Sequence, residues 1–441
     1  MTQRKRLLVA SLLLLWGLAG AWVAWRNVRD EPDLAPGVGR TNPAPETDPI
    51  AKGAYLARAG NCMACHTSPG GEPFAGGRGI STPFGTVFTS NLTPDQATGL
   101  GNWTPAEFWR ALHNGRSRDG RLLYPAFPYT SYSGLTRDDA DALFAYLSSL
   151  TPVRQAPTPH QLRWPYNSQV ALAVWRALYF SPRSPEAVMR PGVEYAEWNR
   201  GAYLVQTLGH CSACHGQRNA LGAIDPDLAW AGGLMPLRDW YAPSLSDTRE
   251  ASVKDWPRQE IVTLLQTGIS ALGAVTGPMA EVVQHSTQYL SDADLRAMAT
   301  FLKDLPGKPS SHSDPVAQVE LAEIPGVPTR IAERGAKLYE QHCAGCHGEQ
   351  GLGVAGAYPA LAGNRAVTLR DATNLIQVVL YGGFAPSTAG NPRPYGMPPY
   401  LLQLSNADVA AVITHLRKSW GNQAAPVSEQ DVNRLRDQVT P

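Results

Sequence analysis

The chain has 441 residues, of which 43% are apolar, and its 38 lysines and arginines nearly balance its 37 aspartates and glutamates. This length suggests about three domains of ordinary size, and the lack of a basic excess excludes an electrostatic case for nucleic-acid binding. The 41 glycines and 37 prolines predict small domains rich in loops.

The N-terminal segment predicts a membrane helix. An uncharged apolar stretch, residues 7–25, follows a basic cluster at residues 4–6. As a helix it would extend roughly 28 Å, enough to cross the hydrocarbon core of a bilayer. The basic cluster predicts a cytoplasmic N-terminus. The alternative is a signal peptide cleaved near residues 19–21. Both interpretations place the remaining chain on the periplasmic side of the bacterial inner membrane.

All six cysteines lie in three copies of the pattern Cys-x-x-Cys-His. Two thiols at this spacing can form thioethers with the vinyl groups of one porphyrin, and the next histidine then lies under the iron as its proximal ligand. A zinc site or a redox dithiol would not need that histidine three times. The pattern therefore predicts three covalently bound haem c groups. The cysteines are Cys62 and Cys65, Cys211 and Cys214, and Cys343 and Cys346, and the histidines are His66, His215 and His347.

The segments around the motifs recur as well. A predicted helix lies before each motif and contains a glycine that is followed three residues later by a leucine. These glycines are Gly53, Gly201 and Gly335. Each repeat closes with a second predicted helix, whose Ser or Thr N-cap is followed three residues later by Asp. These N-caps are Thr136, Ser291 and Ser405, and Asp48 with Pro49 starts the first opening helix. The recurrence predicts three similar domains.

The first two repeats align without a gap over a long stretch, at a displacement of 153 residues. Leu92, Trp103, Glu107 and Gly115 recur as Leu245, Trp256, Glu260 and Gly268. We expect shared core packing at the leucines and tryptophans.

The segments between the repeats differ in character. Residues 170–180 are apolar and aromatic but too short to span a bilayer. They predict either a helix packed between the first two domains or a surface for a partner or a membrane. A further short helix is expected to start at Ser428. The predicted ranges are 1–26 (signal anchor or signal peptide), 27–47 (Pro/Gly-rich tether), 48–152, 195–306 and 329–422 (the three domains), 153–194 (linker with the apolar helix), 307–328 (linker) and 423–441 (tail).

The sixth ligand of each iron separates a closed electron carrier from a haem that is open to other ligands. In the second and third repeats Met279 and Met397 lie in Pro/Gly loops before the closing helix. A methionine ligand there would saturate the iron and raise its potential. The alternative is a core methionine that fills a gap. The first repeat has Phe127 at this place, and phenylalanine cannot bind iron.

The first haem therefore needs another arrangement. His113, two residues before Gly115, is the candidate ligand, because it lies at a predicted helix end near the ligand loop. The alternatives are a histidine that only touches the haem edge or a propionate, an open or water-bound iron, and another donor such as His160. Ligation by two histidines would lower the potential, whereas an open iron would permit ligand chemistry.

Taken together, these residues resemble the tri-haem cytochrome c subunit of bacterial membrane-bound dehydrogenases. The resemblance covers about residues 48–438. It implies a mainly α-helical fold, with three tandem class I cytochrome c domains joined by Pro-rich linkers after an N-terminal hydrophobic helix. It also implies that the carbonyl group of Pro359 orients His347. Besides the three motifs, it rests on residues 85–86, 91–94, 123–126, 277–282 and 419–422.

The resemblance also implies a function. A chain of this kind accepts electrons from a catalytic dehydrogenase subunit, which is a quinoprotein, flavoprotein or molybdoprotein, and passes them to ubiquinone or a terminal oxidase. The methionine ligands of the family carry over to Met279 and Met397 but not to Phe127. A second hypothesis, a peroxidase-like haem enzyme or small-molecule oxidoreductase acting at the first haem, rests on that departure.

Overall fold

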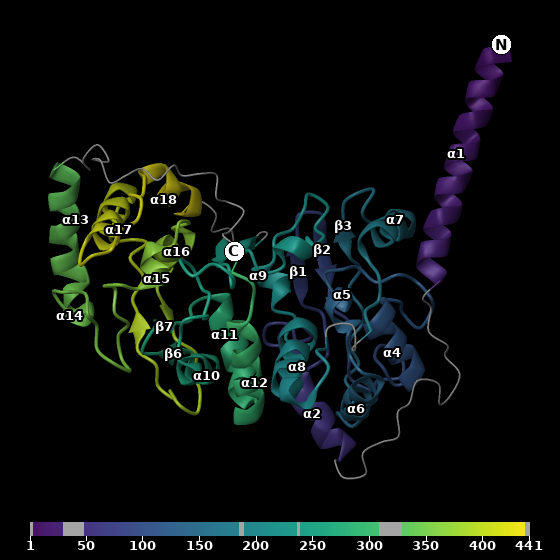
Figure 1. Cartoon of the computed structure of the whole chain (residues 1–441), viewed down its shortest axis with the longest axis horizontal. Helices are drawn as coiled ribbons and strands as arrows, with labels where there is room; N and C mark the ends of the chain where they lie inside the picture. Colours follow the sequence, from purple (N-terminus) through teal and green to yellow (C-terminus); the bar gives the residue numbers. More distant parts are fainter. Residues whose placement is uncertain (1–2, 30–47, 185–188, 236–238, 308–328, 437–441) are drawn as a thin grey trace. The chain divides into compact units, whose positions relative to one another are not determined.

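The structure is a computed structural model that describes residues 3–29, 48–184, 189–235, 239–307 and 329–436. The described part is mainly helical (Figure 1). Its contacts divide it into two units, Met1–Arg190 with Gln206–His210, and Pro191–Val205 with Cys211–Pro441. The predicted tether beyond residue 29 and the predicted linker beyond residue 307 lie outside the described residues.

An apolar helix, α1 (Gln3–Val28), begins the chain and has no buried residue. Its 26 residues would measure about 39 Å, more than the thickness of a bilayer core. Among the described residues it is the one helix long and apolar enough to cross a membrane. The predicted N-terminal hydrophobic helix is thus confirmed, and both the anchor and the signal peptide stay predictions.

Three helix pairs bracket the three cysteine motifs. In each pair the opening helix packs against the closing helix, and the two cross closely at a glycine. A Cβ atom added at Gly53, Gly201 or Gly335 would overlap the backbone of the partner helix. Only glycine permits this approach. The pairs are α2 (Pro49–Ala59) with α6 (Arg137–Ser148), α8 (Ala196–Tyr203) with α12 (Asp292–Lys303), and α13 (Thr329–His342) with α17 (Asn406–Lys418).

The predicted helix caps are confirmed. The side chain of Thr136 accepts a hydrogen bond from the backbone N–H of Asp139, and the pairs Ser291 with Asp294 and Ser405 with Asp408 repeat the arrangement. Asp48 caps α2 in the same way, at 2.9 Å from the nitrogen of Ile50. Ser428 and Asp431 exchange hydrogen bonds across the first turn of α18 (Glu429–Arg436). These bonds satisfy N–H groups that have no partner within the helix.

A small sheet completes the first unit. Strand β1 (Gly79–Thr82) pairs antiparallel with β2 (Gly85–Phe88), which pairs antiparallel with β3 (Gln161–Leu162). Strand β3 comes from the predicted linker 153–194, and the residues of that segment up to Arg190 are grouped with the first unit. Nearby, Asn91 donates from its side-chain amide to the carbonyl oxygen of Val153 at 2.7 Å. The other elements of this unit are α3 (Cys62–Cys65), α4 (Pro105–Asn114), α5 (Tyr129–Tyr132) and α7 (Gln169–Tyr179).

Helix α7 forms from the apolar run at residues 170–180, and Ser168 caps its first turn. Leu172, Arg176 and Ala177 are buried in the first unit. The guanidinium group of Arg176 lies 5.2 Å from the ring centroid of Tyr129 and 4.7 Å from that of Phe180. One face of the predicted helix is therefore part of the core.

The second unit joins the second and third repeats through paired hydrogen bonds. The backbone N–H of Tyr241 donates to the side-chain oxygen of Asn374 at 2.8 Å, and the amide of Asn374 donates back to the carbonyl oxygen of Tyr241 at 2.7 Å. A short helical turn, η2 (Val193–Tyr195), precedes α8. The elements between α8 and α12 are η3 (Leu204–Leu208), α9 (Ser212–His215), η4 (Pro226–Leu228), β4 (Gly233–Met235), β5 (Trp240–Ala242), α10 (Arg258–Thr267), β6 (Ile269–Ser270), β7 (Gly273–Ala274), α11 (Pro278–His285) and η5 (Thr287–Tyr289).

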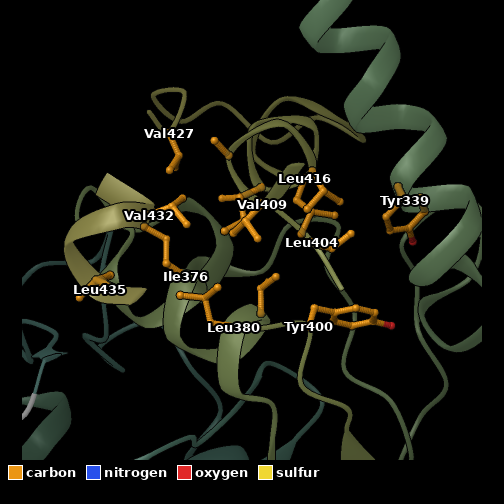
Figure 2. Close-up of a cluster of buried hydrophobic side chains, with 14 of the residues drawn as sticks. Tyr339, Ile376, Leu380, Tyr400, Leu404, Val409, Leu416, Val427, Val432 and Leu435 are labelled. Atoms are coloured by element: carbon orange, nitrogen blue, oxygen red, sulfur yellow. The ribbon is translucent and has the colours of Figure 1, made fainter. Parts of the chain in front are cut away.

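The third repeat has its own apolar core, which Figure 2 shows. Ile376 and Leu380 of α16 (Thr373–Tyr381) lie among Val409 of α17 and Val432 of α18, and each of the four is at most 1% exposed. Arg417 is also buried there and donates to the carbonyl oxygens of Val367 and Leu369 at 2.8 Å each. The remaining elements are α14 (Ala344–His347), α15 (Arg365–Thr368), β8 (Gly383–Phe384) and β9 (Gly396–Met397).

Candidate haem-binding sites

Each Cys-x-x-Cys-His motif forms one turn of helix just after an opening helix, at α3, α9 and α14. In the first two repeats the chain changes direction before this turn, because Asn61 and His210 adopt positive φ angles of 50° and 38°. All six cysteines are free thiols; the first of each pair is half-buried and the second is exposed. The two cysteines of a pair thus lie three residues apart at a single turn of helix, the spacing that attachment to one porphyrin requires.

The motif histidines share one interaction. Each donates from Nδ1 to a backbone carbonyl oxygen: His66 to Ser90 at 2.7 Å, His215 to Pro243 at 2.7 Å, and His347 to Pro359 at 2.9 Å. The bond places the proton on Nδ1 and leaves the Nε2 lone pair for a metal. It also fixes the plane of the imidazole.

The sequence identified one of these three acceptors. The bond to Pro359 was implied by the family resemblance, and the structure confirms it. Ser90 and Pro243 were missed, since any residue type supplies a carbonyl group. A signal was nevertheless available, because the two residues are separated by 153 positions, the displacement that relates the first two repeats.

Burial adjusts the protonation of the motif histidines and cysteines. It lowers the pKa of His66, His215 and His347, and the hydrogen bonds to the carbonyls oppose this only in part. The imidazoles are therefore neutral at physiological pH, the form that binds iron. Burial also raises the pKa of the half-buried thiols, to about 12 for Cys62 and Cys211. These thiols carry no charge that would oppose an apolar porphyrin.

Side chains from other segments hold the motif turns in place. Arg78 and Arg218 donate to the carbonyl oxygens of Ala64 and Ala213, the third residues of the first two motifs. In the third repeat, the hydroxyl of Tyr400 donates to the carbonyl oxygen of His342 at 2.7 Å, directly before Cys343. The sequence analysis did not identify these residues, because their role depends on contacts between distant segments.

The two candidate methionine ligands lie before the closing helices, as the sequence predicts, but they belong to a helix and a short strand instead of the predicted loops. Met279 is in the first turn of α11 and packs against a small core cluster formed by Val275, Ala280 and Val283. Met397 is in β9, opposite Gly383, and packs against the core of the third repeat. Ligation of iron by either methionine remains a prediction.

The corresponding loop of the first repeat is aromatic. The ring of Phe127 lies 5.6 Å from that of Tyr132 and 6.3 Å from that of Tyr129, measured between centroids. Tyr129 is fully buried, and its ring packs over Gly115 at the end of α4. Phe127 is thus part of a packed aromatic cluster.

The two candidate histidines of the first repeat lie on different elements. His113 is on α4, where its ring stacks on Trp109 with a centroid separation of 4.5 Å and an interplanar angle of 21°. His160 precedes β3; its Nδ1 accepts a hydrogen bond from the backbone of Phe88 at 3.1 Å, and its ring meets that of Tyr124 edge-on. Iron ligation by His113 remains a prediction.

Comparison with known proteins gives a consistent result. The cytochrome c family matches residues 50–151 and 332–420 and leaves the middle motif unmatched. The alcohol dehydrogenase (quinone) cytochrome c subunit of Gluconacetobacter polyoxogenes is 39% identical over 89% of this chain and 85% of its own length. The gluconate 2-dehydrogenase cytochrome c subunit of Pantoea cypripedii is 36% identical (89% and 90%), and the fructose dehydrogenase cytochrome subunit of Gluconobacter japonicus is 34% identical (94% and 87%).

The chain belongs to the family of dehydrogenase cytochrome c subunits. Membership implies covalently bound haem c, and the residues present fit that group. Each motif supplies two free thiols and a neutral imidazole whose Nδ1 is already bonded to a carbonyl oxygen. In this cytochrome subunit the iron would undergo one-electron oxidation and reduction.

Proposed function

We propose that this chain carries three haem c groups in three tandem class I cytochrome c domains and transfers electrons for a dehydrogenase. The observation that carries the proposal is the threefold recurrence of one site: a cysteine pair and a histidine whose Nδ1 donates to a carbonyl oxygen. A pyridine haemochrome assay on purified protein should give three haems for each chain. Replacing both cysteines of one motif by alanine should lower this number to two.

The proposed electron donor is a catalytic dehydrogenase subunit that holds pyrroloquinoline quinone, flavin or molybdopterin, and the proposed acceptor is ubiquinone or a terminal oxidase. Relatives named as subunits of alcohol, gluconate and fructose dehydrogenases support this proposal. We further propose that α1 remains as an anchor in the inner membrane and that the haem domains face the periplasm. The positively charged residues at positions 4–6 support that orientation.

Purification from the native membrane tests the proposed partnership. A tagged chain extracted in mild detergent should retain a catalytic subunit, and the substrate of that subunit should reduce the haems within the complex. The isolated chain should oxidise no alcohol, aldehyde or sugar. Turnover by the isolated chain at the rate of the complex would contradict the proposal.

The axial ligands complete the proposal. We propose His215 with Met279 and His347 with Met397 for the second and third haems, and His113 as the sixth ligand of the first. One geometric relation opposes His113. In the second repeat, Leu264 packs against the same cluster as Met279, so its side of the helix faces the ligand loop. The residue at the same position of the first repeat is Ala111. His113 lies about 200° around the helix from Ala111 and therefore on a different side.

A haem enzyme acting at the first haem is the second candidate function, and Phe127 is the observation that favours it. Carbon monoxide added to the reduced protein distinguishes the two. If His113 saturates the iron, none of the three haems binds the gas promptly, and His113→Ala converts one haem to a binding form. If the wild type already binds one equivalent and His113→Ala changes nothing, the first haem is open and the proposal for His113 is wrong.

A further inference from the structure

Helix α7 exposes an apolar stripe. Val170, Val174 and Leu178 are 75%, 41% and 52% exposed, although each is apolar. Residues four apart are neighbours on a helix surface, so the three side chains form one continuous row. Leu172 and Arg176 on the opposite face are buried in the first unit. The stripe therefore faces away from the core that the helix helps to build.

No charged side chain of α7 offsets this exposure. The only ionisable side chains in its sequence, QVALAVWRALY, are Arg176, which is 4% exposed, and the phenol of Tyr179. Trp164, five residues before the helix, is 83% exposed. A surface helix in water normally has a polar outer face, whereas a helix that is apolar on all sides is covered by protein or lipid. This pattern indicates that something covers the stripe.

The C-terminal end of α1 is hydrogen-bonded to α7. The side chain of Arg26 donates from Nε to the carbonyl oxygen of Ala177 at 3.1 Å. The side-chain amide of Asn27 donates to the carbonyl oxygen of Ala173 at 2.9 Å. Two consecutive residues of α1 thus bond to residues four apart on α7. A helix that ran alongside α1 would meet it at intervals of three or four residues. Helix α7 therefore crosses α1 at one level.

That level is the end of the apolar span. Residues 7–25 of α1 carry no charge, and Arg26 is the first charged residue after them. Trp22 and Trp25, just before it, are 42% and 52% exposed. Tryptophans at the end of an apolar span, followed by charged residues, mark the boundary between hydrocarbon and headgroups. Because α7 bonds to Arg26 and Asn27, it lies at this boundary.

We propose that the outer face of α7 lies in the interfacial layer of the bilayer that α1 spans, with Val170, Val174 and Leu178 inserted among the lipids. The inference rests on the proposal that α1 is a membrane anchor. It adds a second, monotopic attachment, which holds the first haem domain against the membrane instead of on a free tether. Continuity with the membrane helix favours lipid over a protein as the occupant.

The attachment reaches the loop of the first haem by direct contacts. The Nε atom of Arg176 donates to the side-chain oxygen of Asn27 at 3.1 Å. The same guanidinium group lies over the ring of Tyr129, which is two residues from Phe127. The buried face of α7 therefore fixes the position of the aromatic loop, while its outer face would lie in lipid.

Photolabelling tests the inference on the full-length haem-loaded protein. The protein is placed in phospholipid nanodiscs that contain a lipid with a diazirine in its acyl chain, and labelled peptides are mapped by mass spectrometry. We expect adducts on α1 and on the peptide that holds residues 170–178. In the variant Val170→Ser, Val174→Ser, Leu178→Ser the label on α7 should fall at least about fivefold, and the label on α1 should not change. Leu402→Ser, at a residue that is 96% exposed in the second unit, is the matched control.

The outcomes separate the inference from its premise. If α1 is labelled while α7 carries no more label than the peptide with Leu402, the interfacial role of α7 is refuted and the anchor stands. If neither helix is labelled, the anchor itself fails. If α7 carries no label and its amides are protected from hydrogen exchange only in the complex with the catalytic subunit, the stripe binds protein, and the inference is overturned.

Discussion

The Nδ1 atom of His66 lies 2.7 Å from the carbonyl oxygen of Ser90, and Ser90 occupies the place that Pro243 holds in the second repeat. The proximal bond is thus preserved although the residue that provides it has changed. This is possible because the acceptor is a backbone atom, which every residue type supplies. The first repeat retains this side of its candidate haem site, and its difference from the others lies in the loop at Phe127.

The change Phe127→Met should give the first haem a sulfur ligand. The side chains have similar volumes, and methionine is flexible enough to reach an iron. We expect the long-wavelength sulfur-to-iron absorption band of the oxidised protein to gain intensity, from two methionine-ligated haems to three. The lowest reduction potential should rise. Phe84→Met, which places methionine beside Tyr166 instead, is the control. An unchanged spectrum would show that the loop at residue 127 does not face the iron.

The changes Met279→Ala and Met397→Ala should each remove one sulfur ligand. Each variant should lose part of the long-wavelength band, bind one equivalent of carbon monoxide when reduced, and have one haem of lower potential. The double variant should show the sum of both effects, because the two sites lie in separate repeats. Met298→Ala, which alters a buried methionine of α12, should leave the band intact. Loss of the band in that control would contradict the assignment.

The change Gly115→Ala should destabilise the first unit by about 2–4 kcal/mol, because it combines backbone strain with a steric clash. Gly115 has a φ of 59°, and an added Cβ would lie 2.6 Å from the ring of Tyr129. Gly120→Ala is the matched control, since its φ is 85° but nothing lies within 4 Å of the added atom. It should cost about 1 kcal/mol. Thermal unfolding followed by circular dichroism measures the loss of stability in both variants. Equal losses would refute the steric clash with Tyr129.

The change Glu250→Gln should reduce the pH dependence of stability in the second unit. Glu250 is buried, and its carboxylate accepts hydrogen bonds from the backbone of Ser244 at 2.6 Å and from the hydroxyl of Tyr241. Burial raises the pKa of Glu250, although these bonds oppose the rise. The folded protein therefore binds this proton more tightly than the unfolded chain does. The resulting stabilisation is complete below the ordinary glutamate pKa and is lost as the pH rises through the higher folded value.

Urea unfolding at several pH values above about 4.3 measures this effect. The wild type should lose stability with rising pH relative to Glu250→Gln, with a difference in slope of at most about 1.4 kcal/mol per pH unit. Glu340→Gln, at an exposed position of α13, is the control and should follow the wild type. Parallel curves for the wild type and Glu250→Gln would contradict the prediction.

The sequence by itself determined the features that depend on neighbours in the chain. The cysteine and histidine of each motif are fixed by the chemistry of attachment, and the caps at Thr136, Ser291 and Ser405 are contacts across three residues. The glycines of the opening helices recur in the sequence, but their reason, the close crossing with the closing helices, is visible only in the structure.

Only the tertiary structure decided which segments that are distant in the sequence are in contact. The pairing of β3 with β2, the bond of Asn27 to Ala173 and the exchange between Tyr241 and Asn374 join residues that are 75 or more positions apart. Several of these contacts use backbone carbonyl groups, which leave no mark on residue type. For the same physical reason the sequence could identify the three histidines, whereas the structure had to supply the carbonyls of Ser90 and Pro243 that orient two of them.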